Sequence, residues 1–418
     1  MTRFSPTVRA AGVLAVIALA AFVVPAGLVA AAAIALILTA AIDAWAVRRP
    51  PEIERTVSRV LSRGAQAPLL VRVFAQDRRR VLLRQPSATG IAVAHATATN
   101  ELRTMLVGSR RGRHQLPGVA SASVGPLGLA SVHHRAQPPA EVRVYPDLRA
   151  ARRLILRLRR GFAGHPGQLT RGPLGLGTDF EAVREYSPDD DIRQLNWTAT
   201  ARLGRPMSNQ YRVERDRDVI GVIDCGRLMS APVGARTMLD AALDTLTVIA
   251  LAADELGDRF GAIAFDDRVR RAISPRHLGG RPAIEALFDL ETRPVDSDFE
   301  LAFSRVHRSR RGLVIVYTDL IDEAAARSLL SGVPVLARRH AVIVASVSDP
   351  ALEALCTQPA ASPIALARRA VALDVLAARE QATIRLRRAG AQVLEASAEK
   401  LPERCLDAYV RAKARARL

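Results

Sequence analysis

The chain has 418 residues, almost half of them hydrophobic, and carries a formal net charge of +19. This length leaves room for two or three compact units beyond any membrane segment. The positive charge is nearly all arginine and is scattered along the chain, without the aromatic residues that single-strand binders place between basic ones, so we expect no nucleic-acid partner.

The first 50 residues contain a long apolar stretch from Ala10 to Val47, interrupted by Pro25 and Gly27. A bilayer core needs about 20 apolar residues in a helix, so the stretch is too long for one span and long enough for two. Arginines flank both ends and none stands at the turn, which predicts a two-helix transmembrane hairpin with both ends in the cytoplasm. A cleaved signal peptide is the alternative, but a second apolar run follows where polar mature sequence would be expected.

Residues 51–150 begin with a predicted connector, amphipathic and rich in arginine, over 51–63. Short β-prone runs then alternate with turns rich in Gly, Pro and Arg. These runs are Leu69–Phe74, Ile91–Ala96, Thr104–Val107 and Val142–Tyr145. The pattern predicts a small antiparallel β module resembling a sandwich.

Residues 151–216 are predicted to form a linker. Apolar residues at helical spacing within Arg152–Arg160 predict a linking helix. The glycine-rich run Gly172–Gly177 lacks the Gly-Lys-Ser/Thr ending of a phosphate loop, so we interpret it as a turn.

Residues 217–418 alternate short apolar strands with helices. The predicted strands are Val219–Ile223, Phe260–Phe265, Val269–Ile273, Leu313–Tyr317, His340–Val347 and Ala391–Leu394. The predicted helices are Met238–Leu256, Pro282–Leu290, Asp298–Arg305, Ala324–Leu330 and Ala365–Ala389. This alternation predicts an α/β domain, doubly wound, whose mostly parallel sheet is covered on both faces. Ligands of such sheets gather at the carboxyl ends of the strands, where Asp224 and Asp319 stand.

The stretch from Gly177 to Trp197 is the most distinctive in the chain. It resembles the signature of a bacterial family filed as domain of unknown function 58, approximately F-E-x-x-R-x-Y-x-x-G-D-D-x-R-x-I-D-W. Ala199–Arg202 and Val213–Arg215 match the segments that follow this signature, whereas Pro188–Asp189 departs slightly from it.

The resemblance covers nearly the whole chain and implies an A-type domain, resembling the von Willebrand factor A fold, over residues 217–418. It also implies a multi-pass protein of the bacterial inner membrane, in contact with lipid and with its soluble domains in the cytoplasm. Members are thought to work beside MoxR-type AAA+ ATPases without established catalytic activity. The expected function is therefore a membrane-anchored scaffold or adaptor for such an ATPase, and not an enzyme.

Charges alternate in sign along the signature, and its conspicuous residues are Arg184, Tyr186, Asp190, Arg193 and Trp197. Carboxylate–guanidinium pairs orient a loop because arginine binds carboxylates in a fixed fork geometry. We therefore interpret the signature as an ion-paired elbow in which Tyr186 and Trp197 are apolar anchors. The alternative is a partner-binding surface, because Trp, Tyr and Arg are typical of binding hot spots.

A-type domains often bind a divalent cation through an Asp-x-Ser-x-Ser motif, a threonine and a second aspartate. Asp224, Ser297 and Asp319 are degenerate candidates for these ligands, but glycine and leucine replace both motif serines. Arg227 places a positive charge beside the site and is expected to pair with Asp224 or Asp319. We therefore expect no cofactor, and Mg²⁺ as the ion if one binds, since it prefers oxygen ligands. A metal-dependent adhesion-type protein is the alternative function.

No nucleophile–base set indicates catalysis. The sequence has neither a Gly-x-Ser-x-Gly elbow nor a His-Glu-x-x-His helix. Cys225 follows a predicted strand beside an arginine, which lowers a thiol pKa, but no histidine lies near it in sequence. We interpret Cys225 as a buried, inert residue. A hydrolase acting on cell-envelope precursors is the alternative from the enzyme class.

Overall fold

A computed structural model describes residues 3–74, 79–163, 179–187, 192, 195–212, 217–320, 323–357, 359 and 362–414. The chain is a mixed structure of helices and strands and divides into two compact units, Met1–Tyr145 and Pro146–Leu418. The glycine-rich run Gly172–Gly177 lies outside the described residues.

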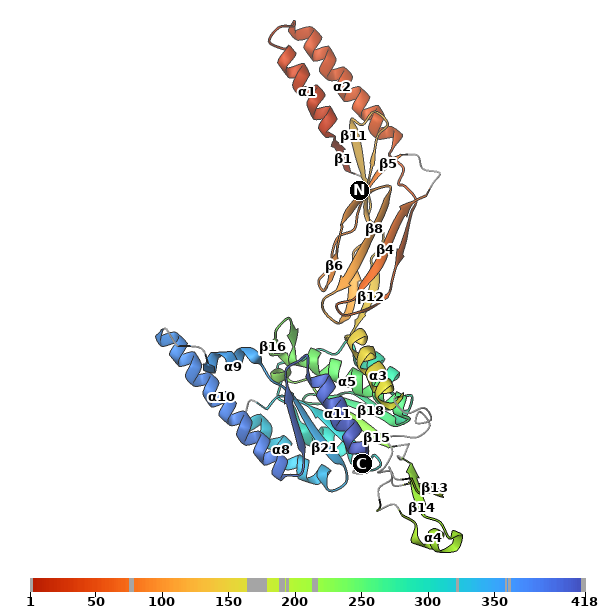
Figure 1. The fold of residues 1–418 in the computed structure, drawn as a ribbon. Helices are drawn as coiled ribbons and strands as arrows, with labels where there is room; N and C mark the ends of the chain where they lie inside the picture. Colours follow the sequence, from red (N-terminus) through yellow and green to blue (C-terminus); the bar gives the residue numbers. More distant parts are fainter. Residues whose placement is uncertain are drawn as a thin grey trace. The chain divides into compact units, whose positions relative to one another are not determined.

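The first unit begins with a short strand and two apolar helices, α1 (Val8–Ala20) and α2 (Ala26–Ala46), which lie against one another (Figure 1). Among the described residues, α2 is the one helix long and apolar enough to cross a membrane. Helix α1 has 13 residues and is about 20 Å long, shorter than the bilayer core of about 30 Å. The structure thus contains one candidate membrane helix at its N-terminal end, with a shorter apolar helix beside it.

Helix α2 is joined to the β module by the buried carboxylate of Asp43. This side chain accepts hydrogen bonds from the backbone N–H groups of Leu127 and Leu129 at 2.8 Å and of Ala130 at 3.0 Å. Thr7, which caps the start of α1, donates its backbone N–H to the carbonyl of Leu129 at 3.0 Å. Because a buried carboxylate without donors is costly, these bonds fix the end of α2 on the tight turn at 125–130.

The β module consists of short, mainly antiparallel strands in three sheets. Their bounds are β1 (Arg3–Pro6), β2 (Ile53–Val57), β3 (Val60–Ser62), β4 (Gln66–Val73), β5 (Arg80–Arg84), β6 (Ile91–Val93), β7 (Thr97–Thr99), β8 (Glu101–Gly108), β9 (Gly112–Leu116), β10 (Ala120–Val124), β11 (Ala130–His134) and β12 (Ala140–Tyr145). The sheet orders are β1-β11-β10-β5-β7, β2-β4-β8-β6 and β3-β12-β9. Inward residues such as Val71, Leu83, Leu106 and Val142 form one core, so the prediction of a β module is confirmed.

The prediction of a connector over 51–63 is wrong, because this segment forms β2 and β3. Residues of β2 alternate between partly buried and exposed, and Ile53 and Val57 pack on the core of the module. The period of two was present in the sequence, but Arg55, Arg59 and Arg63, close behind the apolar stretch, suggested a membrane-surface segment instead.

The second unit is an α/β fold around one six-stranded sheet. Its strands are β13 (Asp179–Glu185), β14 (Met207–Arg212), β15 (Asp218–Asp224), β16 (Pro232–Val233), β17 (Arg236–Thr237), β18 (Arg259–Phe265), β19 (Val269–His277), β20 (Gly312–Tyr317), β21 (Ala341–Val347) and β22 (Gln392–Ala396). Its helices are α3 (Leu148–Ala163), α4 (Trp197–Leu203), α5 (Met238–Leu256), α6 (Gly280–Leu287), α7 (Phe299–Val306), α8 (Glu323–Ala337), α9 (Pro350–Thr357), α10 (Pro363–Arg388) and α11 (Leu401–Ala414), with a 3₁₀ turn at Arg227–Ser230.

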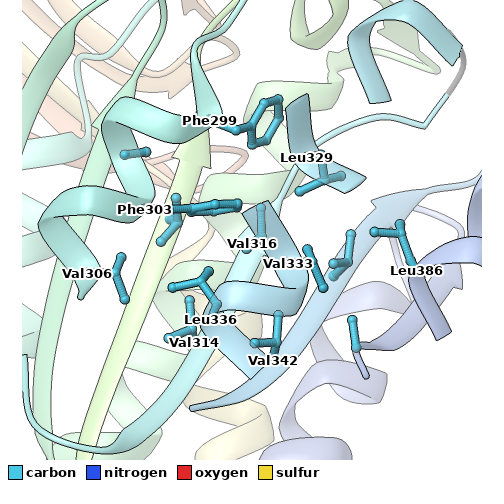
Figure 2. Packing of buried hydrophobic residues seen from close by; sticks show 14 of the residues in the cluster. Phe299, Phe303, Val306, Val314, Val316, Leu329, Val333, Leu336, Val342 and Leu386 are labelled. Atoms are coloured by element: carbon cyan, nitrogen blue, oxygen red, sulfur yellow. The ribbon is translucent and has the colours of Figure 1, made fainter. Parts of the chain in front are cut away.

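The sheet has the order β19-β18-β15-β20-β21-β22, and every neighbouring pair is parallel except β18–β19. Alternate residues of each strand point to opposite faces. On one face, side chains of α7, α8 and α10 pack on Val314, Val316 and Val342 (Figure 2). On the other face, α5 and α11 contact the sheet, and Gly221 leaves room for Leu246 of α5. The expected sheet with helices on both faces is therefore confirmed.

The predicted strands and the helix Met238–Leu256 agree with the structure, whereas three helices of this unit, α4, α9 and α11, were not predicted. Helix α11 has 14 residues and is charged on its exposed side, and α4 and α9 have no buried residue. The basic segment predicted as a linking helix is helical, but it packs against α5, where Ala151 and Ile155 are buried. It therefore belongs to the α/β unit.

Candidate functional site

Two acidic residues follow neighbouring parallel strands at the carboxyl edge of the sheet. Strands β15 and β20 pair in parallel, with Ile223 opposite Tyr317. Asp224 ends β15, and Thr318 and Asp319 come directly after β20. All three are buried, and they line one small cavity of about 30 Å³. The fold thus brings together the two strand-end aspartates that the sequence placed at this edge.

The carboxylate of Asp224 is satisfied by neutral donors. Its Oδ1 accepts hydrogen bonds from the Ser297 hydroxyl and from the backbone N–H of Gly226 at 2.8 Å. Its Oδ2 accepts from the Thr318 hydroxyl at 2.7 Å. Burial raises the pKa of Asp224, and these three hydrogen bonds oppose that rise by stabilising the charged form. Asp224 therefore acts as the acceptor that gathers the three loops at this edge.

The carboxylate of Asp319 pairs with a cation from α10 through one oxygen, while its buried Oδ2 has no hydrogen-bond partner in the described structure. Its Oδ1 lies 2.9 Å from Nη2 of Arg379, whose side chain is only 3% exposed, and it accepts the Leu320 N–H at 2.8 Å. Arg379 also lies 3.4 Å from Glu395 of β22. Burial raises the pKa of Asp319 to about 6, while the charge of Arg379 is the strongest opposing influence. This is a buried ion pair, in which the positive charge of Arg379 compensates the negative charge of Asp319 inside the fold.

The residues at this edge do not fit a Mg²⁺ site. Mg²⁺ takes six oxygen ligands in near-octahedral geometry. Here both oxygens of Asp224 accept hydrogen bonds from protein groups, and the guanidinium of Arg379 lies against the other carboxylate. Among the described residues, no group of three His, Cys, Asp or Glu side chains converges to hold a metal. The protein itself provides the cation here, whereas a metal-binding site would need carboxylate oxygens that are open to the metal ion.

Three details of the site differ from the sequence interpretation. Arg227 does not pair with either strand-end aspartate, because its Nε lies 2.6 Å from Asp296 on the neighbouring loop. The serine missing from position 226 is compensated by Ser297, and a Cβ atom at Gly226 would overlap the Ser297 hydroxyl. The threonine that the loop around Ser297 lacks comes from Thr318.

The signature segment forms a separate hairpin, in which β13 and β14 pair antiparallel as a two-stranded sheet. Backbone and side-chain bonds close it: the Tyr186 N–H donates to the Pro206 carbonyl at 2.9 Å, and the Asn196 amide donates to Asn209 at 2.7 Å. Asn196 also caps α4. The signature therefore specifies a hydrogen-bonded hairpin that contains a short helix.

Large apolar side chains of this hairpin face solvent. Trp197 is 73% exposed, and Ile192 and Leu203 are also exposed. The interpretation of Trp197 as an apolar anchor is therefore wrong. Tyr186 is half-buried, and the side chain of Arg184 donates to the carbonyl of Glu185 at 3.0 Å. Asp190 and Arg193 lie outside the described residues.

The comparison with protein families decides the identity of this region. The model of the family described as "Protein of unknown function DUF58" matches residues 182–393, just over half of the chain. The chain belongs to the DUF58 family. The match begins within β13 and ends in β22, so the DUF58 region contains both the signature hairpin and the six strands of the sheet up to Val393.

The DUF58 chain is also similar to curated relatives described as uncharacterized proteins of Mycobacterium tuberculosis and Mycobacterium bovis. Each is 26% identical over 183 residues, which cover 42% of this chain and 56% of the relative. The match thus spans about half the length of these relatives.

Two solved structures show weak similarity to this DUF58 chain. One is proximal thread matrix protein 1 from the mussel byssus, at 12% identity and a TM-score of 0.29, covering 48% of this chain and 46% of the other. The second is an uncharacterized membrane-spanning protein from Vibrio fischeri, at 10% identity and a TM-score of 0.15, covering 47% and 98%.

Arg379, like Thr318, is a residue of the DUF58 site that was not predicted from the sequence. It lies in the middle of an arginine-rich helix, where one more arginine carries no signal by composition. Its position does carry one, because Arg379 stands seven residues after the buried Ala372 and seven before the buried Leu386. A charge on the apolar stripe of a helix indicates a buried ionic partner.

Proposed function

We propose that this chain is a membrane-anchored cytoplasmic scaffold that binds a MoxR-type AAA+ ATPase through the signature hairpin. The observation that supports it is Trp197, 73% exposed on a hydrogen-bonded hairpin. Exposed tryptophan with flanking apolar residues is typical of binding hot spots. The choice of partner follows from the resemblance of the signature, and membership of the DUF58 family is consistent with it.

The hairpin suits a binding role because it presents its side chains from a fixed frame. Met207 donates its N–H to the Thr200 hydroxyl at 2.9 Å, and Gly204 ends α4 in the left-handed conformation with its N–H bonded to the Thr200 carbonyl. A preorganised surface loses little conformational entropy on binding. Trp197, Ile192 and Leu203 then form the apolar centre of the interface.

We further propose that α1 and α2 form a two-helix anchor in the bacterial inner membrane, with both ends in the cytoplasm. The support is the apolar length of α2, the contact between the two helices, and the arginines beyond each end. Arg48 stacks over the ring of Trp45 at 4.5 Å, an arrangement suited to a membrane–water interface. The α/β unit is proposed to be an A-type domain, supported by its strand order and its strand-end aspartates.

Binding by this scaffold is proposed to be metal-independent and non-catalytic. Arg379 already neutralises Asp319. Cys225, the one strand-end thiol weighed as a nucleophile, is fully buried, as predicted. Its inaccessibility argues against the hydrolase alternative.

The test is a pull-down of the tagged full-length chain from its native membrane in detergent, with and without EDTA, read by mass spectrometry. We expect recovery of a MoxR-type ATPase in both conditions and its loss with Trp197→Ala. Leu278→Ala is the matched control, because Leu278 is equally exposed in the same unit but outside the signature. Recovery only without EDTA would favour the metal-dependent alternative, and equal recovery with Trp197→Ala would reject the hairpin as the docking surface.

A further inference from the structure

A second polar region lies at the opposite, amino edge of the sheet, where a cavity of about 550 Å³ opens. Its walls come from the residues that precede and begin β20, β21 and β22 and from the end of α11. Strand β20 has six residues and is about 20 Å long, so this cavity is separate from the site at the carboxyl edge. Its volume lies in the range of about 300–1,000 Å³ that is usual for small-molecule sites.

Among the described residues, the cavity is lined by four arginines and by no acidic residue. The arginines are Arg311, Arg338, Arg339 and Arg411. Within the described part of the chain, none of the four has a carboxylate within ion-pair distance; Arg339 donates to the carbonyl of His307 at 3.0 Å. Other arginines of the described structure do have such partners, as Arg379 and Arg236 illustrate. The amino edge therefore presents uncompensated positive charge.

His340 makes this cavity more than a solvated group of arginines. It lines the cavity, is 4% exposed, and neither ring nitrogen has a hydrogen-bond partner in the described structure. Burial, followed by the charges of Arg339, His307 and Arg311, lowers the pKa of His340 to about 4. At neutral pH the ring is therefore uncharged and still has one N–H to donate. Buried polar groups without partners are uncommon, and each one calls for an explanation such as a ligand.

We propose that this cavity binds a small anion bearing phosphate groups, held by His340 and the four arginines. Guanidinium groups match phosphate oxygens in a planar, bidentate geometry, and several of them favour a ligand with more than one negative charge. The N–H of His340 donates to a phosphate oxygen and thereby satisfies the orphaned ring. Aliphatic side chains such as Leu313, Val342 and Ile343 form the remaining wall and accommodate an apolar portion of the ligand.

Single-stranded nucleic acid fits this cavity poorly, because none of its lining residues that the structure describes is an aromatic platform for stacking bases. The phosphate group is instead free in solution or carried by a lipid headgroup. Both sources share the chemistry that the cavity recognises, and an experiment separates them.

The test measures binding of inorganic pyrophosphate to the full chain in non-ionic detergent by titration calorimetry. We expect saturable binding that Arg338→Gln combined with Arg411→Gln weakens by at least about tenfold, since two charge-assisted hydrogen bonds are lost. The matched control, Arg268→Gln combined with Arg276→Gln, removes the same charge from exposed positions outside the cavity and should leave the affinity within about twofold. No binding by the wild type, or equal weakening by the control, overturns the proposal.

Substitutions of His340 distinguish binding at a specific site from general electrostatic attraction of anions. His340→Leu removes the N–H and is expected to abolish saturable binding, whereas His340→Gln keeps a donor and should retain part of it. Thermal unfolding of each variant without ligand checks that the fold persists. A His340→Leu variant that folds and binds like the wild type would overturn the proposal.

The lipid arm uses nanodiscs containing phosphatidic acid or phosphatidylcholine. Binding to phosphatidic acid but not to phosphatidylcholine, displaced by pyrophosphate, assigns the site to a headgroup, and pyrophosphate binding without binding to phosphatidic acid assigns it to a soluble ligand. Either result supports the phosphate site if the Arg338 and Arg411 substitutions abolish it. Binding that survives these substitutions contradicts it.

Discussion

At the carboxyl edge of the six-stranded sheet, Asp319 lies 2.9 Å from the buried Arg379, and Asp224 accepts three hydrogen bonds from groups of the same chain. At the amino edge, four arginines and the unpartnered ring of His340 line a cavity to which no described residue contributes a carboxylate. The strands connect the two edges, so both regions share one scaffold.

The difference lies in where the compensating groups come from. A buried charge is tolerated when protein groups surround it, and the carboxyl edge supplies them from its own loops and from α10. The amino edge leaves its charges to solvent or to a ligand. In this chain the edge at which parallel α/β sheets usually bind ligands is closed, and the opposite edge is open.

The largest effect is expected from breaking the closed edge. Arg379→Met leaves Asp319 buried without its cation, and removing one partner of a buried pair costs about 3–5 kcal/mol of unfolding free energy. Urea denaturation of the full chain in detergent, followed by far-ultraviolet circular dichroism, measures the loss.

The control is the double variant Asp319→Leu with Arg379→Met, which removes both charges. We expect it to recover most of the lost stability, because an apolar pair needs no charge compensation. If the single variant were as stable as the wild type, Arg379 would not be the group that closes this edge.

The pH dependence of stability should separate the two edges by sign. Burial raises the pKa of Asp319 from 3.8 to about 6, so the folded state binds this proton more tightly and stability falls as pH rises from about 4 to 6. The pKa of His340 is lowered from 6.5 to about 4, so the unfolded state binds that proton more tightly and stability rises over about the same range. Each displacement corresponds to about 3 kcal/mol, at roughly 1.4 kcal/mol per pH unit.

Because the two contributions oppose one another, substitutions are needed to reveal them. As pH rises from 4 to 6, the stability of Asp319→Asn should increase relative to that of the wild type. The stability of His340→Gln should decrease relative to it over the same range. Asp224, whose pKa burial also raises, is present in all three proteins and does not affect the comparison. Urea denaturation at the two pH values provides the measurement, and identical slopes in all three proteins would contradict both assignments.

The sequence predicted much of this sheet but few of the side chains that pair with its strand-end aspartates. Apolar runs such as Val219–Ile223 and Leu313–Tyr317 identify buried parallel strands by composition alone, and the rule for strand ends then locates Asp224 and Asp319. Partners such as Arg379 and Thr318 reach these aspartates only through tertiary packing. Nor did the sequence indicate the open edge, because nothing in it distinguishes Arg338 and Arg339 from the arginines of this chain that are paired.

A smaller effect tests the hydroxyl that binds Asp224. Thr318→Val keeps the shape of the side chain but removes the donor to Asp224, and leaving a buried acceptor short of a donor costs about 1–3 kcal/mol. Thr383→Val is the matched control, since the buried hydroxyl of Thr383 has no partner in the described structure. We expect this control to be neutral or stabilising in the same urea assay. Equal losses in both variants would mean that the Thr318 hydroxyl has no special role.

The smallest effect compares one substitution at the two edges. Arg227→Gln removes the exposed pair with Asp296 at the carboxyl edge and should lower stability by about 0.2–1 kcal/mol. Arg338→Gln removes one of several like charges at the amino edge and should raise stability by a few tenths of a kcal/mol, because like charges destabilise by similar amounts. Added salt should shrink both differences, since both groups are exposed. If the two substitutions change stability with opposite signs at low salt, the arginines at the amino edge destabilise the unliganded fold, as expected of a site that binds an anion. If both substitutions lower stability, the charge of Arg338 is already compensated.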